Sequence, residues 1–349
     1  MRSVTELPLH GGHAPRWLFG RMVRLSRAIG NVIMDEYGPG EFLNRICDRD
    51  WFQALSCAIG YDWHSSGTTT VTMGALKEGL NESGDIYIAG GKGRAGTNTP
   101  NDIVVGADLL SIPSSSEQFK ESSRLAAKID AGLVYDDIGI YHHTFIFTRS
   151  RKWGVVQQAM SGTAGKAIRF QWLSENVNKT DFADEPHTGI ETEIRTSSMD
   201  LTSKSNSMIR ESSVSALQDY GSLDVKSYPD RHRIIPQLDV GKRGWEIIRK
   251  ASELDPKNYR ELLLLKGVGR STLRSLALIS SLIYDKEISY RDPITYAYNL
   301  GGKDKIPFEI NRKTYDSVVR QMELIVDRAN LEKDEKYRSL KVLNRQISS

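Results

Sequence analysis

The sequence predicts an α+β protein, with a helical and mixed-sheet N-terminal domain followed by an all-α C-terminal domain. Three observations lead to this fold class. Apolar residues recur at helical spacing along much of the first 130 residues. Two aromatic and β-branched runs, at 140–148 and 153–160, flank four polar residues and predict a β-hairpin. Two helical patterns near the C-terminus are separated by Gly-Val-Gly, at 267–269.

The elements of the N-terminal domain can be assigned in order. Helical spacing predicts amphipathic helices over 16–34 and 41–59, and a third helix that starts after the Gly-Thr-Thr-Thr at 67–70. The segment DIYIAGG, at 85–91, predicts a short strand that ends in a glycine turn. A further helix is expected over 118–130, before the β-hairpin.

A third strand and a connector are expected after the hairpin. Residues 167–173 alternate apolar and polar side chains, as a half-buried strand does. Residues 175–232 are polar, with one helix expected near 201–218, which is typical of a connector. We therefore predict a catalytic α+β domain at 1–175, a polar connector with a helix at 176–234, and a helical domain at 235–349 that contains the helix-hairpin-helix motif and binds nucleic acid.

Composition limits the class of protein. The 349 residues are 39% hydrophobic, enough for one large or two ordinary domains. The sequence has no apolar run that would span a bilayer and no apolar signal core near its start, so we expect a cytoplasmic protein with no membrane partner. Cys47 and Cys57 fit neither a zinc nor a redox spacing, and buried reduced thiols are expected.

Charge is unevenly distributed along the chain. Residues 241–349 contain 22 Lys and Arg against 15 Asp and Glu, a net charge of +7, whereas residues 1–240 carry −4. The basic end is where a polyanion is expected to bind.

The Gly-Val-Gly stretch supports a nucleic-acid contact in this basic region. Helices are expected over 257–265 and 270–283, and the glycines between them leave no side chain in the way of a ligand. The start of the second helix offers unpaired N–H donors that suit a phosphate oxygen. The stretch resembles a helix-hairpin-helix motif, which contacts the nucleic-acid backbone without reading bases; an ordinary glycine-capped hairpin is the alternative. The expected contacts are Lys266, Gly267, Gly269, Arg270, Ser271, Thr272 and Arg274.

A second glycine-rich segment, GGKGRAGTNTP, follows the strand at 85–91. Its flexible backbone and two cations, Lys92 and Arg94, suit a phosphate contact, although a plain surface turn is the alternative. The segment lacks Walker spacing, which excludes a P-loop ATPase.

Candidate catalytic residues are grouped in the N-terminal domain. We predict that Asp62, His64 and Asp130 converge with either His142 or Gln157, because a helix break, a helix end and two hairpin strands supply them. Asp62 and Asp130 would hold Mg²⁺ or Mn²⁺, which prefer oxygen ligands, and His64 would act as a base on water. The alternative is that each residue only satisfies local backbone donors.

Several unusual stretches resemble the archaeal and bacterial family called domain of unknown function 763. The resemblance covers almost the whole chain and implies membership of a family without a settled activity. It departs from the family pattern at Ala159, where glycine is common, and at Asn311, where an aspartate is common. The stretches that carry it are LPLHGGHAPRWLF at 7–19, YDWHSSGTTTVTMGALKE at 61–78, AGGKGRAGTNTP at 89–100, IYHHTFIF at 140–147, WGVVQQAM at 153–160 and DPITYAYNLGGKDKIPF at 292–308.

Three function classes follow from these features. The first is a DNA-processing or repair protein, specifically a metal-dependent nuclease that grips the phosphate backbone without sequence specificity. The second is a metal-independent DNA glycosylase that uses Asp292, which lies 23 residues beyond Gly269, although Asp292 also precedes a proline and could simply cap a helix. The third is a non-catalytic nucleic-acid-binding adaptor. The sequence does not distinguish DNA from RNA as the partner, and it does not indicate the oligomeric state.

Overall fold

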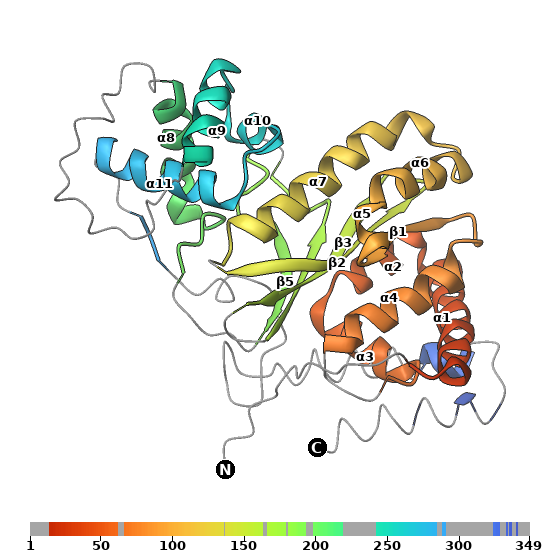
Figure 1. Cartoon of the computed structure of the whole chain (residues 1–349). Helices are drawn as coiled ribbons and strands as arrows, with labels where there is room; N and C mark the ends of the chain where they lie inside the picture. Colours follow the sequence, from red (N-terminus) through yellow and green to blue (C-terminus); the bar gives the residue numbers. More distant parts are fainter. Residues whose placement is uncertain are drawn as a thin grey trace, which may run out of the picture.

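The α+β fold class is confirmed by a five-stranded antiparallel sheet packed between helices (Figure 1). The structure is a computed structural model that describes residues 14–61, 66–135, 137–162, 166–178, 181–192, 198–218, 242–284, 288–290 and 324–328, with 333, 335, 336 and 340.

The sheet follows chain order, β1-β2-β3-β4-β5, with each neighbouring pair antiparallel. The predicted hairpin and the predicted third strand are both present, as β2 to β4, and β5 is an additional strand within the expected connector. Strands β3 and β4 are buried along nearly their whole length, because helices cover both faces of the sheet. The strands are β1 (Ile86–Lys92), β2 (Ile138–Thr148), β3 (Trp153–Ser161), β4 (Ala167–Leu173) and β5 (His187–Thr192).

One face of the sheet packs against the first four helices, α1 (Arg16–Tyr37), α2 (Pro39–Ile46), α3 (Arg49–Ala58) and α4 (Ser66–Leu80). The helix expected over 41–59 is two helices, since the Asp48 side chain caps α3. Its Oδ1 accepts hydrogen bonds from the backbone N–H of Asp50 at 3.0 Å and of Trp51 at 2.7 Å. The core on this face includes Phe42, Phe52 and Ile146.

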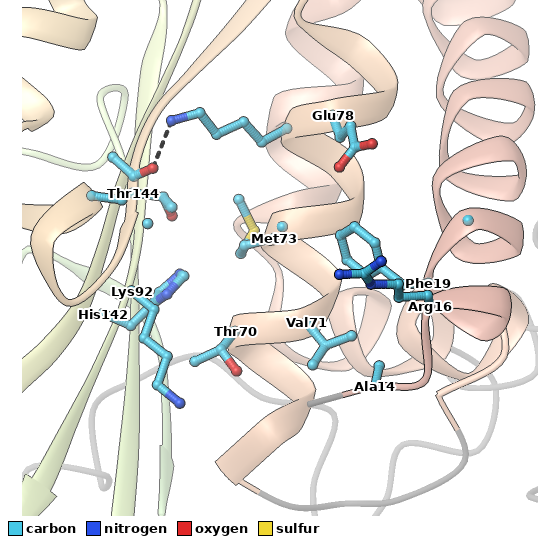
Figure 2. Close-up of a pocket in the computed structure, with 16 residues that line it drawn as sticks. Ala14, Arg16, Phe19, Thr70, Val71, Met73, Glu78, Lys92, His142 and Thr144 are labelled. Carbon is cyan, nitrogen blue, oxygen red and sulfur yellow. Dashed lines mark hydrogen bonds between the residues drawn. The ribbon is translucent and has the colours of Figure 1, made fainter. Parts of the chain in front are cut away.

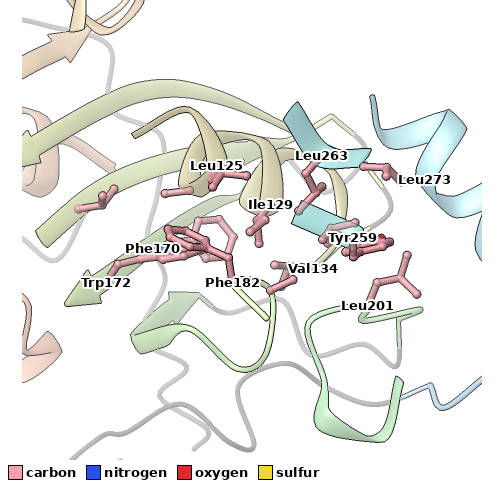
Figure 3. Packing of buried hydrophobic residues seen from close by; sticks show 14 of the residues in the cluster. Leu125, Ile129, Val134, Phe170, Trp172, Phe182, Leu201, Tyr259, Leu263 and Leu273 are labelled. Carbon is pink, nitrogen blue, oxygen red and sulfur yellow. The ribbon is translucent and has the colours of Figure 1, made fainter. Parts of the chain in front are cut away.

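The opposite face packs against α6 (Thr99–Leu109) and α7 (Ser116–Gly132), which follow the short helix α5 (Arg94–Thr97); the 3₁₀ helix η1 (Pro113–Ser115) joins α6 to α7. Helix α7 lies along the sheet (Figure 1). Its apolar side chains Leu125 and Ile129 face a core that includes Phe170 and Trp172 of β4 (Figure 3). That core is continuous from the sheet to the C-terminal helices.

The C-terminal helices pack against one another and against α7 (Figures 1 and 3). They are α8 (Ser207–Gln218), which follows the 3₁₀ helix η2 (Lys204–Asn206), α9 (Lys242–Glu253), α10 (Tyr259–Leu264) and α11 (Arg270–Tyr284). The expected connector thus contributes β5 to the sheet and α8 to this helical group. Across the part of the chain that the structure describes, no helix combines the length and the apolar character needed to cross a bilayer.

Candidate functional site

Five polar side chains share one cross-strand register of the sheet, and we call them the polar row. Consecutive strands contribute one residue each, so that each member pairs with the next. Because neighbouring residues of a strand point to opposite faces, the row lies on the same face as Ile146 and Val156, which pack against α1–α4. The row consists of Lys92, His142, Gln158, Arg169 and Glu191.

The three central members of the row are buried at 1% exposure each. Gln158 is satisfied, because its Nε2 donates to the Ser66 carbonyl at 2.9 Å and to the Tyr141 hydroxyl. Neither ring nitrogen of His142 has a hydrogen-bond partner among the described residues. Burial, aided by His143, Lys92 and Lys77, lowers the pKa of His142 to about 3, so the imidazole is neutral at physiological pH.

Arg169 is also buried without a hydrogen-bond partner among the described residues. Its guanidinium lies 4.6 Å from the ring centre of Phe52. Burial lowers the pKa of Arg169 to about 10 in spite of the opposing charge of Glu191, so the group stays cationic at neutral pH. Glu191, the last member of the row on β5, forms an ion pair with Arg49, with 3.0 Å between Oε2 and Nε.

A cavity of about 600 Å³ lies at the opposite end of the row, between the sheet, α1 and α4. Figure 2 shows Lys92, His142 and Thr144 on the strand side of this cavity and Phe19 on the α1 side, with Met73 of α4 between them. The sheet side of the lining is polar and basic, whereas the helix side combines the apolar Phe19, Val71 and Met73 with the charged Arg16, Lys77 and Glu78. Such a volume suits a small-molecule ligand.

The glycine-rich loop forms one edge of the cavity. Gly90 has φ +88°, and a Cβ there would lie 2.3 Å from the His143 carbonyl oxygen, so only glycine fits. Lys77 Nζ donates to the Gly90 carbonyl at 2.8 Å, and Asp102 accepts from the Gly90 N–H at 3.0 Å. Although burial raises the pKa of Asp102, the hydrogen bonds from Lys77 and Gly90 outweigh it and hold that pKa below its usual value. The loop is thus held in place at its base.

The sequence predicts that two cations of the glycine-rich loop contact phosphate, and they differ in their position relative to the cavity. Lys92 and Arg94 are both exposed, but only Lys92 lines the cavity.

Asp130 and Gln157 come together, but in a sealed core on the α7 face. Gln157 Nε2 donates to Asp130 Oδ2, which also accepts from Trp172 Nε1 at 2.9 Å. Asp130 Oδ1 lies 2.6 Å from His187 Nε2. His143, with its Nδ1 2.7 Å from Gln157 Oε1, occupies the position beside Gln157, whereas His142 faces the other side of the sheet.

This geometry bears on the catalytic and metal roles that the sequence predicts for Asp130. Asp130 is fully buried and both its oxygens accept hydrogen bonds, so the carboxylate lacks a route to substrate or solvent. The described residues hold no cluster of His, Cys, Asp and Glu with metal-binding geometry. Asp62 and His64 lie outside the described residues, as does Asp292.

The C-terminal hairpin between α10 and α11 is anchored to α7 and β2. Lys128 of α7 donates to the carbonyls of Leu263 and, at 3.0 Å, Leu265. Arg270 donates to the Ile138 carbonyl at 3.1 Å, and Arg274 donates to the Gly132 carbonyl at 3.1 Å.

These contacts, together with burial, distinguish the exposed from the partly exposed and buried residues among those predicted to contact phosphate. Arg270 and Arg274 are only partly exposed and hold the hairpin in place, and the Thr272 side chain is buried at 3% exposure. Lys266, Gly267 and Ser271 are exposed, and a Cβ added at Gly269 would meet nothing within 4 Å. The accessible positions of the hairpin are therefore Lys266, Gly267, Gly269 and Ser271, which form its tip.

Sequence reasoning missed four residues of the polar row and of the buried hydrogen-bond network around Asp130. They are Gln158, Arg169 and Glu191 of the polar row and His187 of the buried network. The doubled pairs His142-His143 and Gln157-Gln158 carry the relevant signal, since adjacent polar residues in a buried strand must serve both faces of the sheet.

The comparisons with known proteins identify the family. Residues 3–310 match the family described as "Protein of unknown function (DUF763)", in agreement with the resemblance seen in the sequence. Comparison with curated proteins finds no match, and comparison with solved structures finds none either. Because the family match covers most of the sequence, the chain belongs to the DUF763 family.

Proposed function

We propose that this protein binds the phosphate backbone of nucleic acid, with DNA as the partner, through the tip of the α10–α11 hairpin. The observation that carries the proposal is the contrast between the two sides of the hairpin. Its base is fixed to α7 and β2 by Lys128, Arg270 and Arg274, while Lys266 is exposed and a Cβ at Gly269 would meet nothing within 4 Å.

The tip combines three features that suit a phosphate group. Lys266 supplies an exposed cation, and Gly267 turns the chain with φ +90°. The 15-residue helix α11 begins directly after Gly269, so that its first N–H groups and partial positive charge lie beside the tip. Contacts of this kind position a nucleic acid and give little sequence specificity.

The proposal includes a cytoplasmic location, and it leaves the predicted nuclease activity to be tested separately. Cys47 and Cys57 are buried and form no disulfide, which suits a reducing cytoplasm. The metal-dependent nuclease stays a prediction, because Asp62 and His64 lie outside the described residues and Asp130 is sealed in the core.

The test is fluorescence anisotropy with labelled single-stranded and duplex DNA over a range of salt concentrations. Lys266→Ala should weaken binding and reduce the salt slope by about one. Lys333→Ala, which removes an exposed lysine outside the hairpin, should leave both unchanged. Gly269→Ala should weaken binding by placing a methyl group where a phosphate would lie, with its melting temperature measured as a check on folding.

Two results would overturn the proposal. The first is that the wild-type protein shows no salt-sensitive binding to any DNA. The second is that Lys266→Ala and Gly269→Ala both bind DNA with the same affinity as Lys333→Ala. The same mixtures with Mg²⁺, Mn²⁺ or EDTA test the nuclease directly, since cleavage must then depend on the metal.

A further inference from the structure

The cavity at the Lys92 end of the polar row has a ligand-facing group that the fold itself does not use. His142 is 99% buried, lines the cavity, and has two ring nitrogens without a hydrogen-bond partner among the described residues. A buried polar group without a partner lowers stability, so its retention calls for a function. A ligand in the cavity would supply the missing partner.

The charge of the lining favours an anionic ligand. Among the described residues, three cations line the cavity, Arg16, Lys77 and Lys92, against one carboxylate, Glu78. Lys77 is paired with Asp102 at 2.7 Å, whereas Arg16 and Lys92 are exposed at the rim and have no ion pair with another described residue. A neutral imidazole can donate one N–H to an anionic oxygen at the bottom.

The other wall of the cavity adds an apolar surface. Phe19, Val71 and Met73 lie on the α1 and α4 side, facing Lys92 and His142 across the cavity (Figure 2). A ligand that fills both halves therefore carries an anionic group at one end and a flat or apolar body at the other. The volume of about 600 Å³ accommodates a molecule of the size of a mononucleotide.

We propose that this cavity binds a nucleoside monophosphate group, with the phosphate held by Lys92 and His142 and the base packed against Phe19 and Met73. The group can come from a free nucleotide or from the phosphorylated end of a nucleic-acid strand. The inference is independent of the hairpin, since none of the tip residues lines the cavity.

The experiment measures binding of the full chain by calorimetry to four probes: a nucleoside 5′-monophosphate, inorganic phosphate, and a short oligonucleotide with or without a 5′-phosphate. Lys92→Ala should weaken binding of the phosphorylated nucleoside probes by at least about tenfold, as loss of a charge-assisted contact does. Arg94→Ala is the matched control, because Arg94 is an exposed cation of the same loop that does not line the cavity. It should change affinity by less than about twofold.

His142→Leu separates a binding role from a structural one. It removes two unpartnered buried nitrogens, so the melting temperature should stay the same or rise, while nucleotide affinity should fall by at least about tenfold. Binding of the mononucleotide identifies a free ligand, and binding only of the 5′-phosphorylated oligonucleotide identifies a strand end. The proposal is overturned if no phosphorylated nucleoside probe binds, if inorganic phosphate binds as tightly as the nucleotide, or if Lys92→Ala and His142→Leu both retain wild-type affinity.

Discussion

Asp130→Asn should destabilise the folded protein by about 2–5 kcal/mol, because it breaks a saturated buried hydrogen-bond network. Asp130 is fully buried, and three donors converge on its two oxygens: Gln157 Nε2, Trp172 Nε1 and His187 Nε2. Asparagine has nearly the same shape but replaces one acceptor oxygen with an NH₂ donor. At least one of the three donors then loses its acceptor, and the new NH₂ group faces a donor. Each unsatisfied buried group costs about 1–3 kcal/mol.

Equilibrium unfolding in urea, followed by tryptophan fluorescence, measures this loss. Asp108→Asn is the matched control, since Asp108 is an exposed aspartate of α6, and it should change the unfolding free energy by less than about 0.5 kcal/mol. A loss below about 1 kcal/mol for Asp130→Asn, with an unchanged denaturant slope, would refute a structural role for the network. If a stable Asp130→Asn protein instead lost a metal-dependent DNA cleavage activity, the catalytic role predicted from the sequence would regain support.

Two further predictions concern stability. Burial, with a contribution from Arg124, lowers the pKa of Lys128 to about 8 from 10.5. Between these pH values the unfolded chain binds more protons at Lys128 than the folded chain, so the unfolding free energy should rise with pH; Lys128→Met should remove part of this rise, and an identical pH slope would contradict it. A Cβ at Gly154 would lie 2.3 Å from Cys47 Sγ and 3.0 Å from the Trp172 carbonyl oxygen, so Gly154→Ala should cost about 1–3 kcal/mol. Cys47→Ala should recover part of that loss in the double variant, and strict additivity in urea unfolding would argue against the clash.

Most of the elements could be predicted because their signals are local. Alternation and aromatic content place β2, β3 and β4, and helical spacing places α1, α7 and α11. The break between α2 and α3 was missed because apolar spacing continues through it, and it depends on the Asp48 cap. Strand β5 was missed because its segment is polar and short, and pairing with β4 supplies its backbone partners.

The candidate sites were predicted only in part, for a different physical reason. The sequence shows that polar residues cluster on the hairpin strands, but the face each one uses depends on register across the sheet. A β-bulge between Ile140 and His142 shifts that register, so Tyr141 and His142 both serve the α4 side. The contacts of Arg270 and Arg274 with α7 and β2 join residues more than 130 positions apart, which local patterns cannot indicate.

Helix α7 connects the two sites proposed above. Its Lys128 donates hydrogen bonds to carbonyls of the hairpin. Its Ser123 and Asp130 form the hydrogen bonds of the buried network with His143 of β2, Gln157 of β3 and His187 of β5. The network residues His143 and Gln157 are the chain neighbours of His142 and Gln158 in the polar row. A shift of α7 would therefore move the hairpin tip on one side and change the backbone that positions the polar row on the other. Hydrogen bonds from one helix therefore fix the position of both the hairpin and the strands that carry the polar row.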